Sequence, residues 1–214
     1  MVTEEDVWKL ETPEVTSAGF VPIMMEFYEL SSQEMLDNEP FNVMAVLGGL
    51  FNLAGNVCGA EKLSKWLLKK PELAHRLLRL TTDHIIELAQ YFKDKFGTEH
   101  AIVFAGEAIA SNQVISPKQF EEFALPYVRE EHQKILEMGY KHIYCHICGE
   151  QNENLQYWSH MPFGEPGIIS IGHEVDVLDA ANYMPNEIIL GNLEPAKLQV
   201  ETPEQIYEAS QEII

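Results

Sequence analysis

The chain has 214 residues, 46% of them hydrophobic, which is long enough to bury one sizeable core. Its formal net charge of -20, with no cluster of Lys or Arg, disfavours a nucleic-acid partner because a phosphate backbone would be repelled. The sequence contains no run of about 18 apolar residues and no signal peptide, so a membrane span is not expected and a cytoplasmic location is.

The cysteine content also bounds the protein class. Cys58, Cys145 and Cys148 are the three cysteines, too few for a disulfide framework. A reducing cytoplasm fits this number best.

The first half of the chain alternates strand and helix patterns. We interpret residues 1–39 as a helical or loop lead-in and residues 40–214 as βα units of a single partial domain. The run FNVMAVLGGL, at 41–50, predicts a strand that ends in glycines. Residues 69–97 predict a long amphipathic helix, with Pro71 in its first turn and Gly97 past its end.

A second strand and helix follow with clear boundary signals. HAIVFAGEA, at 100–108, predicts a short buried strand, and residues 116–139 predict a helix. Ser116 and Gln119 form a capping-box pattern at the start of that helix, and Gly139 closes it. Pro126 is expected to kink it.

Three further strands are expected in the second half, at 142–148, 167–173 and 187–192. Short helices are expected at 152–161 and 175–184, and a last helix at 202–214 begins with another capping box, from Thr202 to Gln205. Short apolar strands that alternate with helices predict parallel pairing under helical cover. Five strands fit either an incomplete (β/α)8 barrel or an open doubly wound sheet.

The stretch HIYCHIC carries the clearest chemical signal. Because alternate side chains of a strand share a face, His146 and Cys148 are expected to point to one side and Cys145 to the helix-facing side. This divergence argues against a disulfide between the two cysteines. A histidine and a cysteine at the carboxyl end of a strand are suitable ligands for Zn²⁺. A buried histidine beside an inert thiol remains the alternative.

Several motifs together resemble the uroporphyrinogen decarboxylase superfamily. They are HICGEQNENL, ISIGHEVDVLDAA and IILGNLEPAKLQVETPEQIYEA, preceded by FAGEAIASNQVISPKQFEEFALPY. The likeness is closer to its corrinoid-dependent methyltransferase branch. This resemblance implies a TIM barrel, of which the chain would supply about the third to the seventh strand, and it therefore favours the incomplete barrel.

The resemblance also implies a cofactor and partners. Zinc would be bound by His146, Cys148 and a later cysteine, which has no counterpart before Ile214. The methyl group would move to or from the cobalt of a corrinoid carried by a separate protein. The small-molecule partner would be a methyl donor, such as a methoxylated compound, or a thiol acceptor such as coenzyme M. The motifs are nearer to those of the donor-side enzymes.

Five other residues are candidates for the site. Glu174 is expected on the inner face with a catalytic role, and His173 is an alternative metal ligand. Glu107, at the family's acidic position, is a catalytic candidate whose alternative is a helix-side ion pair. Asn192 and Tyr144 are candidate cofactor contacts, with a turn role and barrel filling as their alternatives.

Two rival interpretations come from different functional classes. One is uroporphyrinogen decarboxylase itself, which needs no metal. The other is a non-catalytic truncated barrel. The exposed sheet edges of such a barrel would favour pairing with another copy, so a homo-oligomer is possible.

Overall fold

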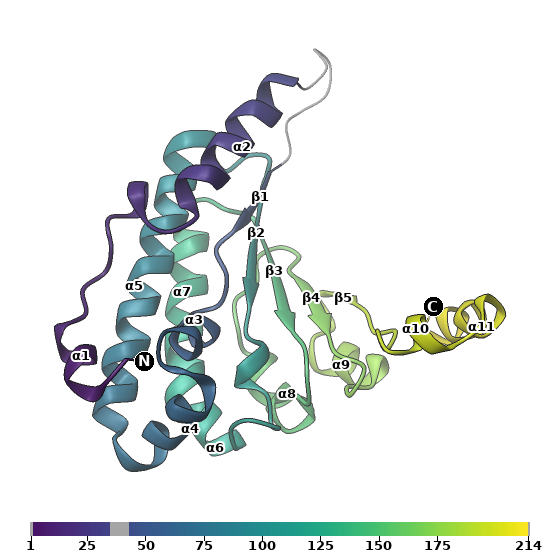
Figure 1. The fold of residues 1–214 in the computed structure, drawn as a ribbon. Helices are drawn as coiled ribbons and strands as arrows, with labels where there is room; N and C mark the ends of the chain where they lie inside the picture. Colours follow the sequence, from purple (N-terminus) through teal and green to yellow (C-terminus); the bar gives the residue numbers. More distant parts are fainter. Residues whose placement is uncertain (1, 35–42, 214) are drawn as a thin grey trace.

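The computed structural model describes residues 2–34 and 43–213, and a five-stranded sheet forms its centre (Figure 1). The strands are β1 (Val43–Val46), β2 (Ala101–Gly106), β3 (His142–Ile147), β4 (Ile168–Ile171) and β5 (Ile188–Leu190). All four pairings are parallel, and the order in space follows the order in the chain. The five predicted strands and their parallel pairing are confirmed. The expected boundary at residues 39 and 40 lies outside the described residues.

Helices connect the strands and pack on one side of the sheet (Figure 1). The α-helices are α1 (Glu4–Lys9), α2 (Val21–Glu34), α3 (Leu50–Cys58), α4 (Ala60–Lys69), α5 (Pro71–Phe96), α6 (Pro117–Gln119), α7 (Leu125–Glu137), α8 (Leu155–Trp158), α9 (Val177–Tyr183), α10 (Lys197–Val200) and α11 (Pro203–Ile213). Short 3-10 turns are η1 (Val15–Ser17), η2 (Ala108–Ala110) and η4 (Asn152–Asn154), and η3 (Phe120–Ala124) is π-helical.

The boundary signals of the long helices act as the sequence predicts. Pro71 begins α5, and the amide of Gly97 caps its end by donating to the carbonyl of Lys93, with φ 73° at the glycine. At the start of α6, Ser116 and Gln119 form the reciprocal capping box. The predicted kink at Pro126 takes the form of a π-helical turn, η3, directly before α7, since proline cannot donate the usual backbone hydrogen bond.

The helix-facing side of the sheet is a closed apolar core. Alternate residues of β1 to β4 point into it and are 6% exposed or less. These include Ala45, Val103, Ile143, Cys145 and Ile169, each 0% exposed. Helices α3, α5 and α7 lie against this side of the sheet, so the apolar core is closed within the described residues (Figure 1).

The opposite side of the sheet, which we call the inner face, is open. Its residues are Met44, Val46, Ile102, Phe104, Gly106, His142, Tyr144, His146, Ile168, Ser170, Ile188 and Leu190, which the strand register sets in rows. Met44 and Val46 are each 42% exposed, and Ile188 is 49% exposed, although all three are apolar. A closed barrel would cover such residues, so the exposed face is that of an incomplete barrel.

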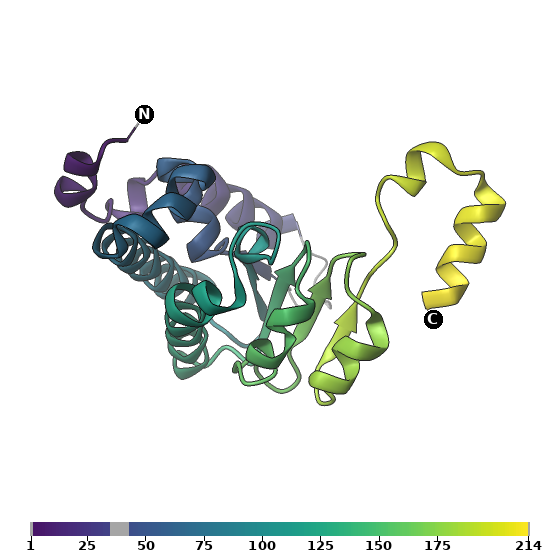
Figure 2. The ribbon, with the colours of Figure 1, turned by 90° about the horizontal axis from the view of Figure 1, so that it is seen from below.

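The two ends of the described chain lie on opposite sides of the sheet. Helices α10 and α11 project away from the body formed by the sheet and its covering helices (Figures 1 and 2). They contain no buried residue. No helix in the described part of the chain is long and apolar enough to cross a membrane.

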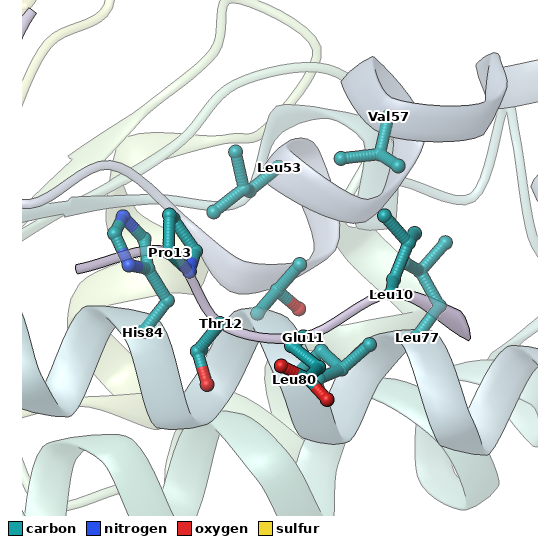
Figure 3. Close-up of a pocket in the computed structure, with 10 residues that line it drawn as sticks. Leu10, Glu11, Thr12, Pro13, Leu53, Val57, Leu77, Leu80 and His84 are labelled. Carbon is teal, nitrogen blue, oxygen red and sulfur yellow. The ribbon is translucent and has the colours of Figure 1, made fainter. Parts of the chain in front are cut away.

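An apolar cavity lies far from the inner face, between the N-terminal segment and the helices. Its volume is about 200 Å³. Leu10 to Pro13 form one wall, and Leu53, Val57 and Leu77 lie across from them on α3 and α5 (Figure 3). None of its lining residues belongs to a strand, so this cavity is separate from the predicted metal ligands.

Candidate metal centre

His146 and Cys148 lie at the carboxyl end of β3, where parallel α/β sheets place their chemistry. His146 is the last inner-face residue of the strand, and Cys148 follows immediately after the strand ends at Ile147. Both side chains are half-buried rather than sealed in the core. The register thus sets His146 on the inner face, and the direction of the Cys148 side chain remains a prediction.

Cys145 differs from Cys148 in how deeply its thiol is buried. Its thiol is fully buried on the helix-facing side, and burial raises its pKa well above the ordinary value. All three cysteines are free thiols. The argument against a disulfide between Cys145 and Cys148 is confirmed.

The imidazole of His146 makes a defined contact across the sheet. Its Nδ1 lies 2.9 Å from Oγ of Ser170, the residue paired with it in the register of β3 and β4. Burial lowers the pKa of His146, which keeps the ring neutral at pH 7, the form that binds metals.

The Glu174 carboxylate lies close to the backbone of Cys148. A side chain at Gly172 would place its Cβ only 2.5 Å from Oε2 of Glu174, 2.7 Å from the amide nitrogen of Gly149 and 3.3 Å from Cα of Cys148. The same oxygen of Glu174 is buried and has no hydrogen-bond partner in the described structure. Burial, and then the nearby Glu174 carboxylate, raise the pKa of the Cys148 thiol. An acidic oxygen that makes no hydrogen bond therefore lies near Cys148.

His173 and Asn192 lie in the loops that follow β4 and β5. The His173 imidazole is 41% exposed, with Nδ1 3.4 Å from Oε2 of Glu174 and Nε2 4.0 Å from Oε1 of Glu194. His173 and Asn192 line a cavity of about 500 Å³ with Asp176, in which neither His146 nor Cys148 takes part. His173 comes after β4 has ended at Ile171, and its polar contacts within the described structure are with Glu174 and Glu194.

Asn192 has the turn role given as its alternative. Its side-chain amide donates to the carbonyls of Gly172, at 3.0 Å, and Val175, at 2.5 Å. It thereby fastens the end of β5 to the loop that carries Glu174. These bonds use both hydrogens of the amide nitrogen, so Asn192 holds that loop in the described structure.

Glu107 lies on the helix-facing side, away from the inner face. Its side chain is 1% exposed, and its Oε2 accepts a hydrogen bond of 3.1 Å from the amide of Phe51 in the first turn of α3. Burial raises its pKa to about 8, although the amides at the helix start favour the charged form. The alternation of side chains along β2 explains this placement. Gly106 ends the strand at an inner-face position, so the next residue, Glu107, falls on the helix-facing side. The expected contact with substrate does not follow from this geometry, and neither does a helix-side ion pair.

A second buried acid near Glu107 was missed by the sequence reasoning. Glu131 of α7 is 0% exposed, and neither carboxylate oxygen has a hydrogen-bond partner within the described residues. Burial, and then the charge of Glu107, raise its pKa well above the ordinary value. Its position among charged residues in the sequence gave no signal, because PYVREEHQ is typical of an exposed helix face.

Tyr144 lies below His146 on the inner face, in line with its predicted filling role. Its ring packs edge-to-face on Phe104, with centroids 5.3 Å apart. None of the inner-face residues of the described strands is Lys or Arg. The surface beneath the candidate ligands is therefore aromatic and apolar, with no cation to bind an acidic substrate.

A buried polar network fixes the loop after Cys148. Asn154 is fully buried, and its amide donates to Oε1 of Gln151 at 2.9 Å and to the carbonyl of Ala110 at 3.2 Å. The same Oε1 of Gln151 accepts from the indole of Trp158 at 3.0 Å. These bonds connect the loops after β2 and β3, so the sequence GEQNENLQYW supports the candidate site without facing it.

The residues suit zinc in type but do not form a complete set. An imidazole, a thiol and a carboxylate oxygen without a partner are the donors that Zn²⁺ binds. Within residues 2–34 and 43–213, no group of three or more His, Cys, Asp and Glu side chains is arranged to hold a metal ion. The described chain therefore offers two candidate ligands, His146 and Cys148, with Glu174 nearby.

Comparison with known proteins shows which family this chain is similar to. The profile described as "Uroporphyrinogen decarboxylase (URO-D)" matches residues 1–214. The chain is 28% identical over 179 residues to "Methylated-thiol--coenzyme M methyltransferase" of Methanosarcina mazei, covering 80% of this chain and 44% of that protein. It is 28% identical over 213 residues to "Methylcobamide:CoM methyltransferase MtbA" of Methanosarcina acetivorans, covering 98% of this chain and 59% of that protein.

A plant enzyme and a solved structure extend the comparison. The chain is 25% identical over 202 residues to "Uroporphyrinogen decarboxylase 2, chloroplastic" of Oryza sativa, covering 88% of this chain and 47% of that protein. The fold resembles the solved "methyltransferase from Methanosarcina mazei" with a TM-score of 0.77 at 18% identity, over 95% of this chain and 58% of the other. The chain thus spans about half the length of the relatives it matches.

Proposed function

The chain belongs to the uroporphyrinogen decarboxylase family, and we propose that it forms the zinc-binding part of a corrinoid-dependent methyltransferase. The observation that carries this proposal is the position of His146 on the open inner face at the carboxyl end of β3, with Cys148 two residues further on, just past the end of the strand. The names of the methyltransferase relatives support the reaction class.

His146 and Cys148 would hold the zinc ion, and the Glu174 carboxylate lies near Cys148. A bound zinc ion supplies Lewis acidity, which lowers the pKa of a thiol or polarises a leaving oxygen. Both uses require an open coordination position, so an incomplete set of protein ligands is compatible with catalysis. The Glu174 carboxylate, near Cys148 and with no hydrogen bond to Oε2, would accept a proton from a bound thiol.

We infer that the small-molecule partner is a thiol, and that a separate corrinoid protein exchanges the methyl group. The names of the three methyltransferase relatives all include coenzyme M, which favours the thiol side over the donor side suggested by the motifs. On this chain, the Phe104 and Tyr144 rings form an apolar floor below His146 that would keep the thiol out of bulk water.

Uroporphyrinogen decarboxylase activity is the second candidate, supported by the match to the rice enzyme. That reaction acts on a substrate with several carboxylates, which calls for cationic side chains. The inner face of the described strands has none. We therefore rank this function below methyl transfer.

The proposal is tested by measuring zinc. The purified chain, exchanged into zinc and freed of excess metal, should retain about one zinc ion per chain by atomic emission. His146→Ala and Cys148→Ala should each lower the affinity by at least about 100-fold in competition with a chromophoric chelator, since each removes one ligand. Equal zinc retention by Cys148→Ala and the parent chain would contradict the proposal.

Cys145→Ala is the matched control for this experiment. It removes a thiol three residues away that faces the helices, so zinc retention should not change. Activity follows by mixing each chain with methylcobalamin and coenzyme M and recording loss of the methyl-cobalt absorbance. Turnover that is independent of zinc would also contradict the proposal.

A further inference from the structure

The ring orientation of His146 depends on one side chain. On one side of His146 in the sheet lies Ser170, whose Oγ is 2.9 Å from Nδ1. On the other side the register places Gly106, which has no side chain. The imidazole is therefore held laterally by Ser170 alone within its row of the inner face.

The two nitrogens of this ring differ in their surroundings. Nδ1 has the serine hydroxyl as its partner, whereas Nε2 has no hydrogen bond to any described residue. Ser170 is 7% exposed and its hydroxyl makes no other hydrogen bond in the described structure. The serine hydroxyl can accept from Nδ1–H or donate to a bare Nδ1, and only the first arrangement leaves Nε2 without a hydrogen.

We propose that Ser170 is a positioning residue: its hydroxyl accepts a hydrogen bond from Nδ1–H of His146 and leaves the Nε2 lone pair directed to the metal. This inference rests on the proposed function for the metal itself, while the tautomer is a property of the chain without metal. Histidines that ligate metals generally donate their second ring N–H to an oxygen, which fixes the ring and raises its basicity.

Two features of the sheet explain why serine suits this position. The pairing of Cys145 with Ile169 and of Ile147 with Ile171 locks the register on the helix-facing side, so Ser170 cannot slide away from His146. The short hydroxyl reaches Nδ1 without filling the space in front of the ring. A longer polar side chain at 170 would compete with a ligand for that space.

The first test reads the tautomer in the metal-free chain by long-range ¹H–¹⁵N NMR at pH 7.5. The parent chain should show His146 with a protonated Nδ1 and a bare Nε2. Ser170→Ala should shift the population toward Nε2–H, and Ser170→Thr, which keeps the hydroxyl, should restore the parent pattern. Ser159→Ala, which removes a hydroxyl bound to the Gln156 carbonyl away from this row, is the matched control and should change nothing.

The second test measures zinc affinity in the same variants. Ser170→Ala should weaken zinc binding by about 10- to 100-fold and Ser170→Thr by less than about 3-fold, as expected for a residue that orients a ligand. A circular dichroism melt of each variant checks that the fold is retained.

The outcomes separate this inference from the proposed function. An Nε2–H tautomer in the parent chain, or a tautomer and a zinc affinity that Ser170→Ala leaves unchanged, overturns the role of Ser170 while zinc binding stands. A tautomer that depends on Ser170 in a chain that binds no zinc supports the positioning and overturns the methyltransferase proposal.

Discussion

The two sides of the same five strands have opposite properties. On the helix-facing side, Val103, Ile143 and Ile169 are each 0% exposed and packed under helices. On the inner face, Met44, Val46 and Ile188 are apolar and yet 42% to 49% exposed, and they lie in the two rows that precede the row of His146 and Ser170. Stability and chemistry are thus assigned to alternate residues of one strand.

The two sides of the sheet also differ in their titratable groups. The helix-facing side buries Glu107 and Glu131, whose raised pKa values keep them protonated near neutral pH. The inner side carries a neutral histidine, a thiol and a carboxylate oxygen that has no hydrogen bond. The acids on the first side are therefore closed off from solvent, whereas the groups on the second side are half-buried and can meet a ligand.

The largest expected effect contrasts two isoleucines. Ile143→Ala should lower the free energy of unfolding by about 2–5 kcal/mol, because it opens a cavity in a closed core. Ile188→Ala, at a position 49% exposed on the inner face, should cost less than about 1 kcal/mol. Urea denaturation monitored by tryptophan fluorescence measures both. Equal losses would show that the inner face is covered in solution.

A pH effect of intermediate size is expected from Glu107. The folded chain holds its proton up to a pKa of about 8, whereas the unfolded chain releases it near 4.5, so the folded state binds more protons between these values. Stability from this group is therefore fully present below about pH 4.5 and falls by up to about 1.4 kcal/mol per pH unit until about pH 8.

Glu107→Gln should flatten this pH dependence of the urea midpoint, since glutamine is neutral throughout. Glu122→Gln, which changes an exposed carboxylate on η3, is the matched control and should leave the slope as it is. A slope that Glu107→Gln leaves intact would mean that another group, such as Glu131, releases the proton.

The smallest expected effect concerns the thiols. Cys145→Ser should destabilise the fold by about 1–3 kcal/mol because it buries a hydroxyl in the core, and Cys148→Ser should change stability by less than about 0.5 kcal/mol.

In the native chain, a thiol reagent should label one cysteine, Cys148, and in denaturant all three. Protection of Cys148 by zinc would link this reactivity to the candidate site, whereas labelling of Cys145 in the native chain would contradict the assignment of sides.

Much of the fold was predictable because the signals are local. Continuous apolar runs marked the strands, Ser116 and Thr202 marked helix starts, and Gly97 marked a helix end. The period of two in HIYCHIC separated Cys145 from His146 and Cys148 without any knowledge of neighbours. These features depend only on residues close together in the chain, so the sequence alone determined them.

The tertiary structure decided which of these residues meet. The contact of His146 with Ser170 depends on the register of β3 and β4, and Glu107 lies under α3 because Gly106 is the last inner-face position of β2. His173 follows the end of its strand at Ile171 and contacts Glu174 and Glu194. Such contacts join residues that are tens of positions apart, and no local periodicity carries the information that sets their distance.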